Sequence, residues 1–124
     1  MILTNQLKEI IIVETTHYAK VLKIKRVPDL CFELIPFHKD SQNTKQWGHY
    51  YHADQRLGRL IYLNIKKHKN MAELLYTIVH ELVHVRYPIL KHGVKFEQLV
   101  EQTLKKDSSI AGLKTVESDK RPAL

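Results

Sequence analysis

Apolar residues recur every three or four positions along residues 3–22. This spacing places them on one face of a helix, and Thr4 is available to cap its first turn. Val27-Pro28-Asp29 then interrupts the pattern, because proline cannot continue a helix and restricts the residue before it. The pattern therefore predicts an amphipathic N-terminal helix that ends before Pro28.

The middle of the chain contains three short segments with the composition of strands. Residues 30–37 are aromatic and partly alternating, and residues 38–46 form a polar stretch typical of a loop. The segments "WGHYYHAD" and "RLIYLNI" flank "QRLG" at a spacing that suits an antiparallel hairpin. We therefore expect a small, three-stranded, largely antiparallel sheet.

Two more helices are predicted after the sheet. Residues 71–86 have the clearest helical periodicity in the chain, and Tyr87-Pro88 marks their end. Residues 94–106 also carry apolar side chains at helical spacing. The expected fold class is α+β, with one domain at residues 1–106 and a tail at residues 107–124 that is flexible or docks into a cleft.

Composition indicates a soluble globular protein, with 44% hydrophobic and 27% charged residues. The longest purely apolar run, residues 10–13, is far below the roughly 20 residues needed to cross a bilayer, and the N-terminus lacks the layout of a signal peptide. We therefore expect a cytoplasmic protein with no membrane partner. The single cysteine, Cys31, leaves histidine and carboxylate as the ligands for any metal.

The chain is basic, with a formal net charge of +7. The basic residues gather in three places: Lys20, Lys23, Lys25 and Arg26; Lys66, Lys67 and Lys69; and Lys91 and Lys95. Such charge is compatible with a nucleic-acid partner and equally with an ordinary solvated surface. No aromatic residues interleave with these clusters as they do in single-strand binding proteins, so charge alone leaves both interpretations open.

The stretch "TIVHELVHVRYPILKHGVKF", residues 77–96, carries the candidate chemistry. On a helical wheel His80, Glu81 and His84 share one face, and the large apolar residues occupy the opposite face. Two histidines one turn apart can bind one ion, and the glutamate between them then lies beside the open coordination position. This arrangement suits Glu81 as a general base.

A catalytic zinc ion needs a third protein ligand. His92 is the best candidate, because the helix ends before Pro88 and Gly93 allows the chain to approach the metal closely. Glu97, one turn into the next helix, is the competing ligand. We expect the remaining histidines to be ordinary surface or core residues: His17, His38, His49, His52 and His68.

The sequence "HELVH" followed by "HGVKF", and preceded by "WGHYYHADQRLGRLIYLN", resembles the SprT-like zinc metallopeptidases and the related minigluzincins and YgjP-like proteins over about residues 3–106. The resemblance implies a zincin-like fold and hydrolysis of peptide bonds in a protein or peptide substrate by a zinc-activated water. The residue roles that it implies are one catalytic Zn²⁺ held by His80, His84 and His92, Glu81 as general base, and Phe96 as a core residue.

Two features depart from the SprT-like pattern or extend it. SprT-like proteins that act on DNA–protein crosslinks commonly carry additional zinc-ribbon segments, and this chain has no cysteine pairs to form one. Action near DNA therefore stays open. Minigluzincins are of this small size, and their C-terminal segments can block the cleft, which suggests by analogy that residues 107–124 hold the enzyme latent.

Two other functions stay open at this point. One is a non-catalytic, zinc-containing module that binds nucleic acid or protein, which a fourth protein ligand such as Glu97 would favour. The other is a zinc hydrolase that acts on a carbonyl other than a peptide. For a peptidase, the substrate is expected to add as a strand to the sheet edge. The sequence does not decide which residue stabilises the oxyanion among Tyr50, Tyr51, Arg86 and Tyr87.

Overall fold

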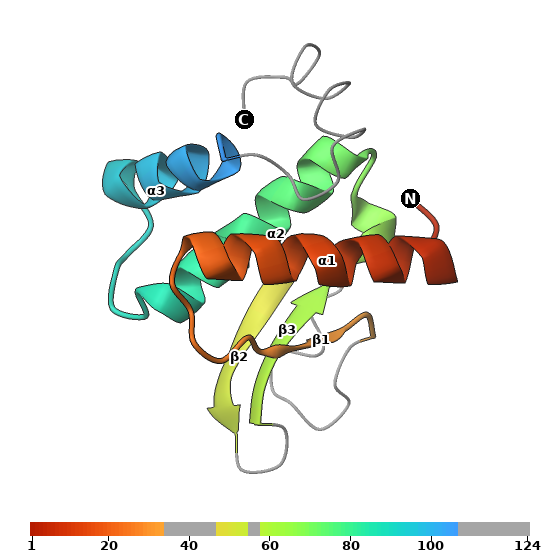
Figure 1. The fold of residues 1–124 in the computed structure, drawn as a ribbon, viewed down its shortest axis with the longest axis horizontal. Coiled ribbons are helices and arrows are strands. Elements are labelled where there is room, and N and C mark those ends of the chain that lie inside the picture. The colour runs from red at the N-terminus through yellow and green to blue at the C-terminus, as the bar shows by residue number, and fades with distance from the viewer. Residues whose placement is uncertain (34–46, 55–57, 107–124) are drawn as a thin grey trace.

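The computed structural model describes residues 1–33, 47–54 and 58–106. In chain order they form α1 (Asn5–Val21), β1 (Asp29–Cys31), β2 (Gly48–Asp54), β3 (Gly58–Leu63), the 3-10 helix η2 (Ile65–Lys67), α2 (Met71–Arg86) and α3 (Val94–Leu104) (Figure 1). The predicted α+β class is confirmed. Four predicted features lie wholly or partly outside the described residues: residues 34–37 of the first strand, the loop at 38–46 with His38, residues 55–57 of the hairpin turn, and the tail at 107–124.

The long helices begin and end where local chemistry requires. Thr4 caps α1, since its Oγ1 accepts a hydrogen bond from the Leu7 amide at 3.0 Å. Asn70 caps α2 in the same way, through a 2.9 Å bond from the Glu73 amide to its Oδ1. The α2 helix ends at Arg86, two residues before Pro88. Within the described ranges, no helix combines the length and apolar character needed to cross a membrane.

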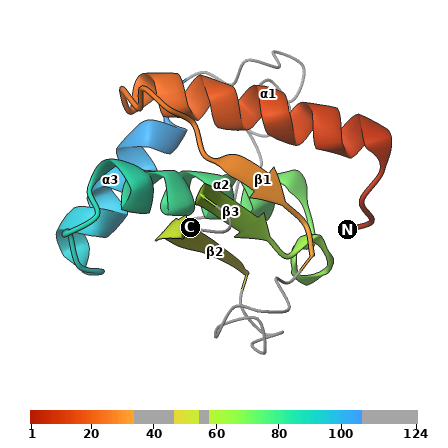
Figure 2. The same ribbon diagram turned by 90° about the horizontal axis from the view of Figure 1, so that it is seen from below.

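The described sheet has the strand order β1-β3-β2, which Figure 2 shows from below. The predicted hairpin is confirmed, because β2 pairs antiparallel with β3, while the shorter β1 pairs parallel with β3. The Asn64 amide donates to the Trp47 carbonyl at 2.9 Å, so Trp47 and Asn64 form a hydrogen-bonded pair of the antiparallel ladder. By alternation, the peptide groups of Gly48 and Tyr50 point away from β3 at the outer edge of this sheet.

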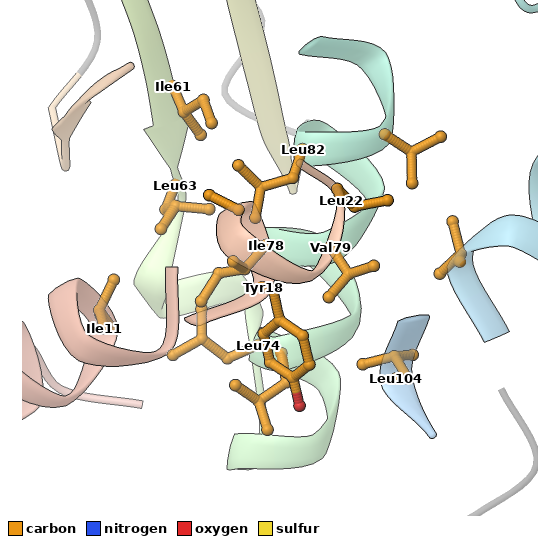
Figure 3. Packing of buried hydrophobic residues seen from close by; sticks show 14 of the residues in the cluster. Ile11, Tyr18, Leu22, Ile61, Leu63, Leu74, Ile78, Val79, Leu82 and Leu104 are labelled. Atoms are coloured by element: carbon orange, nitrogen blue, oxygen red, sulfur yellow. The ribbon is translucent and has the colours of Figure 1, made fainter. Parts of the chain in front are cut away.

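The α2 helix lies at the centre of the fold and packs against α1, α3, β2 and β3. Figure 1 shows α1 crossing α2, and Figure 3 shows side chains from α1, β3, α2 and α3 meeting in one cluster. Its members include Ile11 and Tyr18 of α1, Ile61 and Leu63 of β3, Leu74, Ile78, Val79 and Leu82 of α2, and Leu104 of α3. The core therefore fixes one face of α2 and leaves the other face for the site.

A buried histidine joins the end of the sheet to the start of α2. His68 is 1% exposed, with Nδ1 2.7 Å from the Asn64 carbonyl oxygen and Nε2 2.7 Å from Thr77 Oγ1. The Trp47 ring packs edge-on against the imidazole at 4.9 Å. Burial lowers the pKa of His68, so the folded protein favours the neutral ring. His68 is thus a satisfied core histidine, as expected from the sequence.

This burial makes His68 a source of pH-dependent stability. Below its ordinary pKa of 6.5 the unfolded chain takes up a proton at His68 that the folded protein does not bind. The free energy of unfolding therefore falls as the pH drops below 6.5, and this contribution levels off below the folded pKa. NMR titration of the ring Cε1–H signal, assigned with His68→Gln, should give a midpoint below 6.5. A midpoint at or above 6.5 would contradict the burial effect.

Candidate metal centre

Two helices and the loop between them carry the histidines of the candidate metal centre. α2 supplies His80 and His84, and His92 lies in the loop, just before α3 begins. Gly93 caps α3 with φ = 155°, a conformation that a residue with a side chain rarely adopts. A Cβ built on Gly93 meets nothing within 4 Å, so the chain needs this glycine for its backbone conformation and not for space.

The three imidazole rings converge on one point. His84 Nε2 lies 3.2 Å from His80 Nε2 and 2.8 Å from His92 Nε2, and all three ligand atoms lie within 4.8 Å of one another. Tetrahedral zinc with bonds of about 2.0–2.1 Å separates its nitrogen ligands by about 3.4 Å. The three histidines therefore lie close enough to hold a single metal ion, and their donor set fits one.

Phe96 forms the base of this cluster. It is fully buried, and its ring centroid lies 4.8 Å from that of His80, 4.7 Å from His84 and 4.9 Å from His92. Because one rigid ring contacts all three imidazoles, it restricts the rotamers through which they could turn away from each other. Phe96 is a core residue whose packing also orients the candidate ligands.

The surroundings favour neutral imidazoles at the cluster. Burial, and then the neighbouring His80, His92 and His49, lower the pKa of His84 to about 4. Burial and His92 also lower the pKa of His80. A histidine must be deprotonated at the coordinating nitrogen to bind a metal, so these shifts keep the rings ready to bind at neutral pH.

Glu81 lies next to this cluster and is nearly enclosed. It is 6% exposed, and burial raises its pKa to about 7, although a hydrogen bond from the Tyr50 backbone amide works in the opposite direction. Since the Tyr50 amide points to the outer edge of β2, this bond places the carboxylate at the boundary between the helix and the edge strand. Glu81 and His80 both line the cleft beside them.

Glu97, the competing ligand in the sequence, is engaged elsewhere. Its Oε2 accepts a 2.5 Å hydrogen bond from the Tyr76 hydroxyl, and it is not part of the cluster that the described histidines form. Burial and this bond to Glu97 raise the pKa of Tyr76 well above its usual range, so the phenol keeps its proton and stays a donor. The structure brings His92, and not Glu97, to His80 and His84.

A cleft of about 740 Å³ opens over the cluster. Its lining consists of Gly48, His49, Tyr50, His80, Glu81, His84, Pro88, Ile89 and His92. Of the four candidates for the oxyanion, only Tyr50 lines this cleft. Tyr51 is buried in a small cluster with Leu60 and Tyr62, and Arg86 donates to the Leu22 carbonyl at 3.0 Å while its guanidinium lies over the Tyr87 ring.

Sequence reasoning missed the part of the site that β2 supplies. We expected His49 to be an ordinary residue, yet it lines the cleft and influences the pKa of His84. Gly48 lets β2 approach α2, since a Cβ there would lie 2.8 Å from Thr77 Cγ2 and 3.0 Å from the Tyr62 carbonyl oxygen. Alternation of side chains predicted the hairpin itself. It could not show that β2 packs against α2, because that is a tertiary contact.

No family model, curated protein or solved structure matches this chain. The case for a function therefore depends on the fold and the geometry of the site.

The ligand assignment predicts which substitutions weaken metal binding. His80→Ala, His84→Ala and His92→Ala should each lower the affinity for Zn²⁺ by about 100-fold or more, because each removes one of three donors. Glu97→Gln should lower it by less than about 10-fold, since this carboxylate is bonded to Tyr76. Competition with a chromophoric chelator measures each affinity. A larger loss for Glu97→Gln than for His92→Ala would make Glu97 the third ligand.

The close approach at Gly48 predicts a second effect. Gly48→Ala should destabilise the metal-free protein by about 1–3 kcal/mol, because the added methyl overlaps the Thr77 methyl and the Tyr62 carbonyl. Urea denaturation measures the loss. Adding Thr77→Ser removes the methyl and keeps the hydroxyl near His68, so the double variant should recover part of the stability relative to Thr77→Ser alone. No recovery would show that the Thr77 contact is not the cause.

Proposed function

We propose that the protein is a zinc-dependent endopeptidase of the SprT-like or minigluzincin type, with Glu81 as its general base. The observation that carries the proposal is the convergence of three imidazole nitrogens beside a buried carboxylate in an open cleft. Three histidines without a fourth protein ligand are typical of catalytic zinc sites, whereas structural sites are closed by four. A bound Zn²⁺ lowers the pKa of a water molecule toward about 7 and polarises a carbonyl oxygen.

The chain's own residues supply the remaining steps. Glu81, at the wall of the cleft, accepts the proton of the attacking water and passes it to the leaving amine. The Tyr50 amide holds the Glu81 side chain in place, and Phe96 orients the three histidines. These contacts come from β2 and α3, so the site is assembled from three separate parts of the chain.

The outer edge of β2 is the proposed binding site for the substrate backbone. The peptide groups of Gly48 point away from β3, and Gly48 itself lines the cleft. An extended peptide that pairs with this edge would run past Glu81 and the histidines, as in other cases of strand addition. The net charge of +7 makes action near nucleic acid a further part of the proposal, and the cytoplasm its proposed location.

The alternative of a non-catalytic zinc module has less support. A closed coordination sphere would favour that function, and Glu97 is the fourth ligand that the sequence offered for it. The hydrogen bond from Tyr76 holds the Glu97 carboxylate outside the histidine cluster. A site with three histidines suits catalysis better than it suits a purely structural role.

The proposal predicts that Glu81 is essential for cleavage but not for metal binding. Zinc-loaded wild type should cleave an unstructured protein such as casein, and Glu81→Gln should be slower by about 100-fold or more, because the amide cannot accept the proton. Glu81→Gln should still bind one equivalent of zinc. Each protein is assayed with and without single-stranded DNA, and stimulation by DNA would identify the setting in which the enzyme acts.

The matched control is Glu9→Gln, which changes an exposed glutamate of α1 and should cleave like wild type. Cleavage by Glu81→Gln at the wild-type rate would refute its role as the base. If wild type is inactive, the same assay with a chain truncated after Lys106 tests whether the tail holds the enzyme latent. Inactivity of both forms in the presence of zinc would contradict the peptidase proposal.

A further inference from the structure

The metal cleft continues into a second cleft along α2. This neighbouring space of about 540 Å³ shares Gly48, His80 and Glu81 with the cleft over the histidines. Its other lining residues are Trp47, Glu73, Tyr76 and Thr77. A molecule bound at the metal centre therefore has a chamber directly beside it, with room for one large side chain.

Two of the polar side chains that line this chamber are already bonded to other parts of the protein. The Tyr76 hydroxyl donates to Glu97, and Thr77 Oγ1 lies 2.7 Å from His68 Nε2. The Thr77 methyl faces Gly48, where it lies 2.8 Å from a Cβ built on that glycine. Besides His80 and Glu81, which it shares with the metal cleft, the chamber offers a ligand mainly the rings of Tyr76 and Trp47 and a methyl group.

Desolvation disfavours an ionic side chain in this chamber. Glu73 lines it, and its Oε1 accepts a 2.8 Å bond from the Lys69 amide at the start of α2. The Lys67 ammonium lies 5.7 Å from the centre of the Trp47 ring and is not part of the chamber lining. A lysine or arginine side chain that entered would be desolvated between the two aromatic rings, and an acidic one would in addition meet the carboxylates of Glu73 and Glu81.

The two aromatic walls are held in place before any ligand binds. Trp47 is fixed by the bond from the Asn64 amide to its carbonyl and by the edge-on contact of its ring with His68. Tyr76 is fixed by Glu97 of α3. A preformed apolar chamber binds a side chain without the cost of ordering its own walls.

We propose that this chamber is a specificity subsite that takes an aromatic or large aliphatic side chain of the residue next to the scissile bond, with Trp47 as the main determinant. The inference rests on the proposed peptidase function, because it assigns the chamber to a substrate bound at the metal centre. Trp47 is 42% exposed and outside the main core, so it can be changed without loss of the fold.

Zinc-chelating hydroxamates test the subsite without any need for catalysis. Two series cover both sides of the scissile bond: N-acetyl amino acid hydroxamates and malonyl hydroxamates of amino acid amides, each made with phenylalanine, leucine, alanine, lysine and glutamate. Calorimetry with the zinc-loaded full chain should show phenylalanine or leucine binding about 10-fold or more tightly than alanine in one series. Trp47→Ala should reduce this ratio to about 3 or less, and Trp47→Phe, which keeps a ring, should retain most of it.

Equal affinities in both series, tightest binding by lysine or glutamate, or a preference unchanged in Trp47→Ala would each overturn the subsite. Casein cleavage by the same preparations separates this result from the proposed function. Discrimination among hydroxamates without cleavage, by the full chain and by the chain truncated after Lys106, would keep the subsite and reject the peptidase. Cleavage without discrimination would keep the peptidase and reject the subsite.

Discussion

Packing of one face of α2 into the core determines where the metal-binding side chains lie. Leu74, Ile78 and Leu82 are at most 1% exposed, and burial of each such side chain contributes about 1.5–3 kcal/mol. His80 and His84 project from the same helix away from this cluster and are only partly buried. Their positions thus depend on apolar contacts that touch no ligand, and a change in the core would move the site.

The convergence of the histidines has a cost that the rest of the fold must offset. The Nε2 atoms of the three neutral imidazoles lie 2.8 and 3.2 Å apart, and they satisfy only part of one another's hydrogen-bonding capacity. In addition, His80 Nδ1 is buried with no partner among the described residues. An ion that binds only the folded protein recovers this cost and stabilises the fold by mass action. Without an ion, Phe96 keeps the three imidazole rings from turning away from one another, because it packs against all three.

Local patterns in the sequence predicted the helices and one face of the site, because helical periodicity and capping depend on neighbouring residues. Residues 71–86 were predicted with the observed bounds, and the shared face of His80, Glu81 and His84 follows from the same periodicity. Pro88 and Gly93 already favoured His92 as the third ligand, but the sequence left Glu97 open, because the bond from Tyr76 to Glu97 joins two helices and has no local signal. The parallel pairing of β1 with β3 and the part that β2 plays in the cleft are likewise long-range contacts.

The bond between Glu81 and the Tyr50 amide joins the proposed catalytic group to the proposed substrate-binding strand. Without a side chain at Gly48, β2 comes close enough to α2 for this bond to form. The positions of the β2 edge and of the Glu81 carboxylate are therefore coupled. A shift of β2 would move the peptide groups that would pair with a substrate, and with them the Tyr50 amide that holds Glu81. A peptide aligned on that edge would be positioned by the same strand that positions Glu81, so β2 would determine both how the substrate binds and where the proton-accepting carboxylate lies.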